Sequence, residues 1–219
     1  MMIKILILLL IIVLVIRATY GAYFIKHIQP TLRCLRHYEP QVGDVVFTCV
    51  WQPSRWTMMN ILVRPSFTTS YGTCFMHSMI VYGEEGKLLH FYAKPYHPEG
   101  KALCMRSHVH TDHLSGFMEK SNGVGTTVIE VWRPPRTVYI DLRKVIRDYC
   151  HKPFSVIPLQ KESYECTSFT ASLLVDLGLL PTWDRKKFPH PLLQGALKEN
   201  GFTKIGRFGL CGGKKMNTL

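Results

Sequence analysis

The chain has 219 residues, and its 27 Lys and Arg outnumber its 15 Asp and Glu, which gives a formal net charge of +12. This length provides for one compact domain and a terminal segment, and excludes a multidomain arrangement. The basic residues are spread along the chain and not gathered in one tract with aromatic residues, so specific nucleic-acid binding is not expected. A solubilising surface, or a face towards an anionic membrane, accounts for the charge.

Seven cysteines stand at irregular spacings, and no two of them form a CxxC pair. Because the number is odd, at least one thiol stays free in any intramolecular pairing. We therefore do not expect a disulfide-stapled domain. A reducing compartment fits the chain better, and a working thiol nucleophile needs one.

Residues 1–26 are predicted to be an N-terminal membrane anchor or, alternatively, a signal peptide. Ile5 to Ile16 is an unbroken run of twelve aliphatic residues. The longer stretch from Ile3 to Ile25 reaches the about 20 residues that span a bilayer, provided that Arg17 extends its charge to the interface. No good signal-peptide cleavage site follows the apolar run, which favours a retained anchor. More basic residues come after the segment than before it, which predicts a single-pass protein with its domain on the cytoplasmic side.

The remainder of the chain is predicted to form three parts. Residues 27–39 form a basic juxtamembrane linker, residues 40–210 a globular domain, and residues 211–219 a flexible tail. The globular domain is therefore where any chemistry is expected.

The first half of the domain contains three runs rich in β-forming residues. They predict strands at 45–50, 76–82 and 87–93. The turn 83–86 joins the last two strands as a hairpin. No regular element is predicted for 94–125, which is rich in Pro, Gly and His.

The second half mixes strands and helices, which predicts the α+β class. The predicted elements are strands at 126–132 and 137–140, a short helix at 141–149 with Asp141 as N-cap, a helix at 165–177, and a last strand or loop around 202–208. The helix at 165–177 is the clearest, because Gly178 supplies a stop after its apolar stripe.

Cys166 lies in the first turn of that helix. Unpaired backbone N–H groups and the helix dipole stabilise a thiolate there and lower its pKa. Acyl transfer would still require a base to move the proton. The plainer interpretation is a buried cysteine at a helix start with no chemical role.

Three motifs stand in a suggestive order along the chain. They are Gly43–Phe47, His77–Gly83, and Tyr164–Phe169 with the helix after it. In these motifs the chain resembles the circularly permuted branch of the NlpC/P60 papain-like superfamily, which includes YiiX-like bacterial proteins and relatives in large DNA viruses. The resemblance covers most of residues 40–195. It implies a papain-like α+β fold, a small antiparallel sheet or half-barrel with the cysteine helix packed against it.

The same resemblance implies roles for five residues. Cys166 matches the family nucleophile, and His77 matches the base. The third polar group, which orients the imidazole, falls on His90 of the next strand. Tyr164, or backbone N–H groups at the helix start such as that of Thr167, would form the oxyanion hole.

The function that this resemblance implies is that of a thiol hydrolase or acyltransferase that needs no cofactor. The substrate would be a peptide, an amide or a lipid ester, and the predicted anchor makes the lipid membrane a partner. The viral relatives suggest a virion or host membrane. A non-catalytic, membrane-tethered structural or virion protein on the same scaffold is the first alternative.

The second alternative is a zinc hydrolase. The sequence HxHxDH, formed by His108, His110, Asp112 and His113, is the zinc signature of metallo-β-lactamase-like enzymes. Such closely spaced ligands can bind Zn²⁺ and activate water. The acidic residue expected before the motif and the ligands expected after it are missing from recognisable positions.

Overall fold

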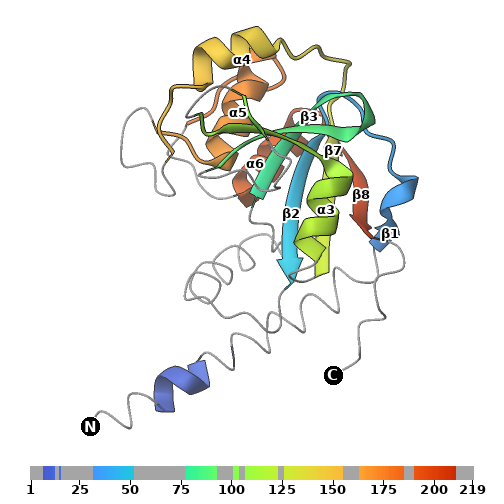
Figure 1. Ribbon diagram of the computed structural model, residues 1–219, viewed down its shortest axis with the longest axis vertical. Coiled ribbons are helices and arrows are strands. Elements are labelled where there is room, and N and C mark those ends of the chain that lie inside the picture. Colours follow the sequence, from blue (N-terminus) through green and yellow to red (C-terminus); the bar gives the residue numbers. More distant parts are fainter. Residues whose placement is uncertain are drawn as a thin grey trace.

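A computed structural model describes residues 7–12, 15, 32–51, 77–92, 101–103, 107–122, 126–154, 163–184 and 190–210. Within these residues, eight strands form one sheet in the order β1-β8-β7-β2-β3-β4-β6-β5, and helices pack on it (Figure 1). The architecture is therefore α+β, as the sequence predicts.

The bounds of the strands are β1 Leu32–Cys34, β2 Val45–Trp51, β3 His77–Gly83, β4 Lys87–Phe91, β5 Lys101–Ala102, β6 Val109–His113, β7 Thr126–Arg133 and β8 Thr203–Gly209. The helices are α3 Leu114–Asn122, α4 Leu142–Tyr149, α5 Cys166–Asp176 and α6 His190–Glu199, with short 3-10 turns η3 Leu35–His37 and η4 Glu84–Gly86.

The sheet is larger than the small antiparallel sheet that the family resemblance implies. Its central strands are antiparallel, but β1 pairs with β8 in parallel, so the sheet is mixed. Residues 32–37, which the sequence pattern assigns to the linker, form β1 and η3 and thus belong to the folded domain. The domain therefore begins before residue 40.

The two faces of the sheet carry separate hydrophobic clusters, because side chains alternate along each strand. On β3, Ile80 belongs to one cluster, whereas Met79 and Val81 belong to the other. The Ile80 cluster includes residues of α4, α5 and α6. The Met79 cluster includes Phe117 and Met118 of α3. Helices therefore cover both faces of the sheet.

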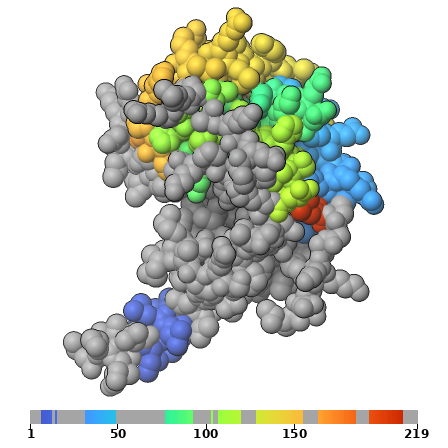
Figure 2. Space-filling model, in the orientation of Figure 1, coloured from blue at the N-terminus to red at the C-terminus, as the bar shows by residue number. Residues whose placement is uncertain are grey.

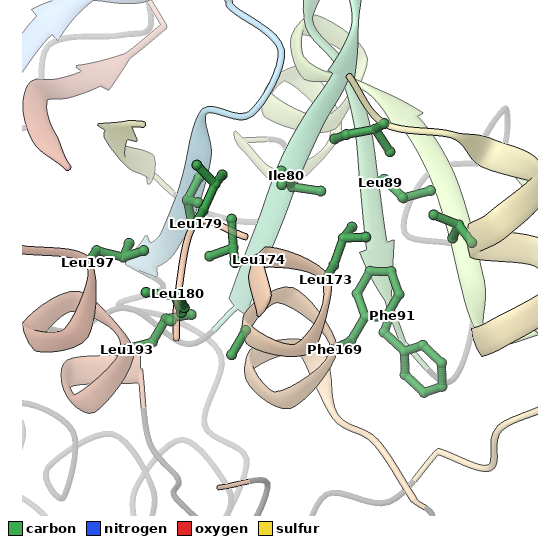
Figure 3. Close-up of a cluster of buried hydrophobic side chains, with 14 of the residues drawn as sticks. Ile80, Leu89, Phe91, Phe169, Leu173, Leu174, Leu179, Leu180, Leu193 and Leu197 are labelled. Atoms are coloured by element: carbon green, nitrogen blue, oxygen red, sulfur yellow. The ribbon is translucent and has the colours of Figure 1, made fainter. Parts of the chain in front are cut away.

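The packing of α5 on β3 and β4 holds its first turn in place. In Figure 3 the apolar side chains of α5 point at the side chains of these two strands. The residues concerned are Phe169, Leu173 and Leu174 of α5, Ile80 of β3, and Leu89 and Phe91 of β4. Burying each such side chain contributes roughly 1.5–3 kcal/mol.

Both ends of α5 agree with the sequence prediction. Glu165 is its N-cap, in a capping box with Ser168. Gly178, just after the helix, has φ +66°, a conformation that glycine adopts without strain. The helix is thus fixed at both ends by local chemistry as well as by packing.

Three parts of the domain differ from the prediction. The segment 94–125 contains β6 and α3, and the Pro-rich stretch after α5 contains α6. Pro191 is the second residue of α6, where a missing N–H costs no intrahelical bond. Residues 137–140 are irregular instead of a strand, because Pro134 and Pro135 end the ladder of β7.

At the N-terminus, residues 7–12 are helical and their apolar side chains are exposed. Among the described residues, no helix is long and apolar enough to cross a membrane. Most of the predicted anchor lies outside the described residues, as do residues 52–76 and the predicted tail 211–219. Cys34 is disulfide-bonded, unlike the reduced state that the sequence predicts for the cysteines, whereas Cys150 and Cys166 are buried thiols outside any disulfide.

Candidate functional site

Cys166 is the first residue of α5 and is 7% exposed. Its thiol donates a hydrogen bond to Glu165 Oε2 at 3.3 Å. Its sulfur also accepts a hydrogen bond from the backbone N–H of Ser78, the second residue of β3. The sulfur therefore lies at the start of the strand that begins with His77.

The way in which β3 and β4 diverge explains this contact. Their ladder starts at the pair Ile80 and Leu89, so it stops short of Ser78. The N–H of Val81 points to β2, where it donates to Asp44 O at 2.9 Å. Because N–H directions alternate along an antiparallel strand, the N–H of Ser78 points to the β4 side. The sulfur of Cys166 takes the place of the strand partner there.

His77 lies against His90, as the sequence predicts. His77 Nε2 is 3.1 Å from His90 Nδ1, and the rings meet edge to face at an interplanar angle of 89°. The register that pairs Ile80 with Leu89 brings His90 level with Met79, two residues from His77 on the same face. The hairpin therefore brings the two imidazoles together as diagonal neighbours.

Asp112 extends this pair to a row of three. Its Oδ2 is 2.9 Å from His90 Nε2, and both side chains are almost completely buried. Asp112 lies opposite Leu88, two residues from His90, so it is again a diagonal neighbour across the β4–β6 ladder. His77, His90 and Asp112 thus lie side by side on β3, β4 and β6. We refer to them as the histidine row.

Sequence reasoning places Asp112 only in the alternative zinc site. The signal that could have found its contact with His90 is the alternation in His110-Thr111-Asp112, which is typical of a strand with one polar buried face. Because the Pro, Gly and His content of 94–125 predicts no strand there, the partner of His90 is missed from the sequence.

The HxHxDH residues do not converge on a point. His110 Nε2 donates to Tyr92 O at 3.0 Å, whereas Asp112 accepts from His90. The ring of His108 lies against Phe91, and His113 is exposed. In the described part of the chain no group of three or more His, Cys, Asp or Glu residues could hold a metal ion. The arrangement does not support the zinc interpretation.

The electrostatics of Cys166 differ from the expectation of a lowered thiol pKa. Burial, and after it the negative charge of Glu165, raise the pKa of the Cys166 thiol well above its usual value. The helix N-terminus does not offset this, because the Glu165 carboxylate already accepts from the N–H groups of Thr167 at 2.7 Å and Ser168 at 2.6 Å. Burial also raises the pKa of Glu165. These surroundings favour the neutral thiol of Cys166 over its thiolate.

The predicted oxyanion-hole residues, Tyr164 and Thr167, are both buried. The Tyr164 ring packs in the core against Phe91 and Tyr149. The backbone N–H of Thr167 donates to Glu165, and its buried Oγ1 also lies close to the Glu165 carboxylate. The Thr167 hydroxyl also lowers the pKa of the Cys166 thiol, so it lies close to the sulfur. The hydroxyl is thus better placed to donate than the backbone amide.

Tyr92 is a site residue that the sequence pattern does not single out. Its ring meets the His77 ring at a centroid distance of 5.4 Å and is 38% exposed. Burial raises the pKa of Tyr92, and the charge of a Cys166 thiolate raises it further. Tyr92 therefore lies near both the histidine and the sulfur, at the border between the site and solvent.

Comparisons of the chain with protein-family models, with curated proteins and with solved structures found no match. Inferences about function therefore come from the geometry of these side chains, together with the resemblance in sequence motifs.

Proposed function

We propose that the protein is a thiol hydrolase or acyltransferase in which Cys166 is the nucleophile and His77 the base. One observation carries this proposal. The sulfur of Cys166 is hydrogen-bonded to the backbone of Ser78, the residue next to His77, and the His77 ring is held by His90. A nucleophile, a base and a group that orients the base are the three parts that covalent acyl transfer needs.

The reaction begins from the neutral thiol. His77 takes the proton of Cys166, and the electron pair left on sulfur attacks the carbonyl carbon of an amide or ester. His77 then returns the proton to the leaving amine or alcohol, which leaves a thioester on Cys166. Water or another acceptor, deprotonated by His77, attacks the thioester and takes the acyl group, and the departing Cys166 sulfur regains the proton from His77. Because burial disfavours a free thiolate, proton removal and attack are coupled in this scheme.

A permuted papain-like fold is part of the proposal. Its support is the order of the parts along the chain, with the histidine strand β3 before the cysteine helix α5, and the packing of α5 on β3 and β4. Within that superfamily the substrate is a peptide, an amide or a lipid ester. With a net charge of +12 and an apolar N-terminus, we favour a substrate at an anionic membrane surface. A single-pass anchor with the domain on the cytoplasmic side, in a host or virion membrane, stays a prediction.

The non-catalytic scaffold is the competing proposal, and the burial of Cys166 is the observation that favours it. A structural cysteine would also be a buried neutral thiol. A scaffold does not, however, require a buried, hydrogen-bonded imidazole pair such as His77 and His90, because apolar side chains fill a core without needing such partners.

The two proposals differ in whether Cys166 becomes acylated. The full-length protein in lipid nanodiscs would be incubated with 4-nitrophenyl esters of short and long acyl chains, and intact mass would be recorded. We expect one acyl adduct, assigned to Cys166 by peptide mapping, that disappears in Cys166→Ala and forms much more slowly in His77→Ala.

Cys150 supplies a matched control, because among the described residues it is the other buried cysteine that keeps its thiol. Cys150→Ala should form the adduct at the wild-type rate. An adduct that persists in Cys166→Ala, or a folded wild-type protein that no acyl donor modifies, would contradict the enzyme proposal and favour the scaffold.

A further inference from the structure

The histidine row restricts where protons can sit. A carboxylate only accepts hydrogen bonds, whereas a neutral imidazole has one donor and one acceptor nitrogen. With Asp112 ionised, its contact with His90 Nε2 at 2.9 Å requires the His90 proton on Nε2. Nδ1 of a neutral His90 is then an acceptor, so the 3.1 Å contact requires the His77 proton on Nε2. The lone pair of His77 is left on Nδ1.

Burial makes the reverse arrangement costly. His90 and Asp112 have side-chain exposures of 0% and 1%, and His77 is 5% exposed. A donor facing a donor, or an acceptor facing an acceptor, would leave buried polar atoms unpaired, which costs about 1–3 kcal/mol for each. Both hydrogen bonds therefore favour a single set of tautomers.

The neighbouring ring does not supply a competing partner. His110 lies with its ring centroid 5.8 Å from that of His90, but its Nε2 donates to Tyr92 O. Burial, and after it the neighbouring His90, lower the pKa of His110. Asp112 is thus the carboxylate that bonds directly to an imidazole of the row.

We propose that Asp112 is a positioning residue that fixes the tautomers of His90 and His77 and so leaves His77 Nδ1 as the base. The role of His77 as the base rests on the proposed function. The tautomers assigned to His77 and His90 do not depend on it. In the first chemical step, the thiol proton of Cys166 moves to His77 Nδ1 and the electron pair stays on sulfur. The imidazolium formed keeps its Nε2–H bonded to His90, and the charge of Asp112 stabilises it through that ring.

The wild-type protein tests the proton positions directly. With ¹⁵N-histidine label in the full chain, long-range ¹H–¹⁵N spectra distinguish a protonated from an unprotonated nitrogen in each ring. We expect the proton on Nε2 in both His77 and His90. A proton on Nδ1 of either ring would overturn the proposal, whether or not the protein forms an acyl adduct.

Two variants test whether Asp112 is responsible. Asp112→Asn can donate to His90 Nε2, which shifts the row towards the reverse tautomers and puts a proton on His77 Nδ1. We expect kcat to fall on the order of 10³- to 10⁴-fold with KM nearly unchanged, as when the carboxylate behind a catalytic histidine is replaced by an amide. Asp112→Glu keeps the carboxylate, so its spectra should retain the wild-type tautomers even where stability is reduced.

Asp44→Asn is the matched control, because Asp44 is also fully buried but bonds to Tyr38 and Arg133 instead of a histidine. It should lower stability and leave the tautomers unchanged. Wild-type tautomers together with wild-type kcat in Asp112→Asn would overturn the role of Asp112. Failure of acylation in a wild-type protein with the expected tautomers would instead contradict the proposed function alone.

Discussion

Glu165 acts on the cysteine and on the helix at the same time. Its carboxylate caps α5 by accepting hydrogen bonds from two backbone N–H groups. It also accepts a hydrogen bond from the thiol of Cys166. The helix start that would stabilise a thiolate is therefore occupied by a negative charge that opposes one. In the proposed mechanism this arrangement keeps the cysteine protonated until a substrate and His77 act on it together.

Removing that charge should make the thiolate form at lower pH. Burial is the largest cause of the raised pKa of Cys166 and the charge of Glu165 the second. In Glu165→Gln the second cause is lost, whereas the side-chain oxygen can still cap the helix. The pH at which iodoacetamide alkylation of Cys166 reaches half its maximal rate should therefore decrease and stay above that of an ordinary thiol.

The alkylation of Cys150 in the same samples is the internal control, because Cys150 bonds to Ser107 and not to Glu165. Its pH profile should not move. A Cys166 midpoint that stays the same or rises in Glu165→Gln would show that the carboxylate does not oppose the thiolate.

At the scale of elements, the site depends on the place where β3 and β4 separate. Strands β2 and β3 stay paired as far as His77, whereas the β3–β4 ladder starts only at Ile80. The start of α5 meets this opening, and its sulfur replaces a strand as the partner of Ser78. This contact requires α5 to stay packed on the sheet. The apolar face of the helix provides that packing.

Phe169 should contribute most to that packing. Its side chain is fully buried, and its ring lies 5.4 Å from that of Phe91 on β4. Phe169→Ala should lower the free energy of unfolding by about 3–5 kcal/mol, because it removes a large core side chain and leaves a cavity. Val175→Ala is the control, since Val175 lies on the same helix but is only partly buried. Urea unfolding should show a clearly smaller loss for Val175→Ala, and equal losses would contradict this account of the packing.

The elements that could be predicted are those whose side chains repeat with a clear period. Strands β2, β3, β4 and β7 have runs of β-forming residues, and α5 has both an apolar stripe and a glycine stop. The sequence pattern does not predict strand β6, because the buried positions of this strand include His110 and Asp112 instead of apolar residues alone. Among the described residues, the side chains of this face bond to His90 on β4 and to Tyr92 just after it, which are about twenty residues away in sequence. Local patterns therefore could not indicate the contact of Asp112 with His90.

The same limit applies to the chemistry of the cysteine. Its place at a helix start can be predicted from local signals, but its pKa depends on burial and on the Glu165 carboxylate. The sequence pattern marks Glu165 as the beginning of the helix and not as the group that occupies the helix N–H groups. A capping carboxylate and a thiolate compete for the same backbone N–H groups at the helix start. The three-dimensional structure is needed to see which of the two accepts from them.

At the scale of the whole molecule, the order of strands in the sheet separates the N-terminal side of the domain from the site. In the space-filling view, α4 contributes an outer surface at one end of the molecule, and its Arg143 and Lys144 are part of the basic excess (Figure 2). Strand β1 is the first described strand and lies at one edge of the sheet, whereas β3 lies four strands away. The histidine row and the first strand thus belong to different parts of the sheet.

The disulfide at Cys34 should contribute to global stability. Cross-linking restricts the unfolded chain, and the loss of such a bond typically costs about 2–4 kcal/mol. Cys34→Ser should lower the free energy of urea unfolding by that amount. Addition of a reductant should lower the stability of the wild-type protein by a similar amount and leave Cys34→Ser nearly unchanged. A reductant effect that persists in Cys34→Ser would show that another bond is responsible.

Strand β1 also determines how the domain bears mechanical load. A pull on the N-terminal segment reaches the domain first through β1, which is held to β8 over only three paired positions. Parallel strands pulled along their length resist by shear, and so short a ladder would yield early. Cys34, the last residue of β1, is disulfide-bonded, so this strand stays covalently attached when its hydrogen bonds yield. Because β3 lies four strands from β1, loss of the β1–β8 pairing would leave the strands that carry His77, His90 and Asp112 paired with one another.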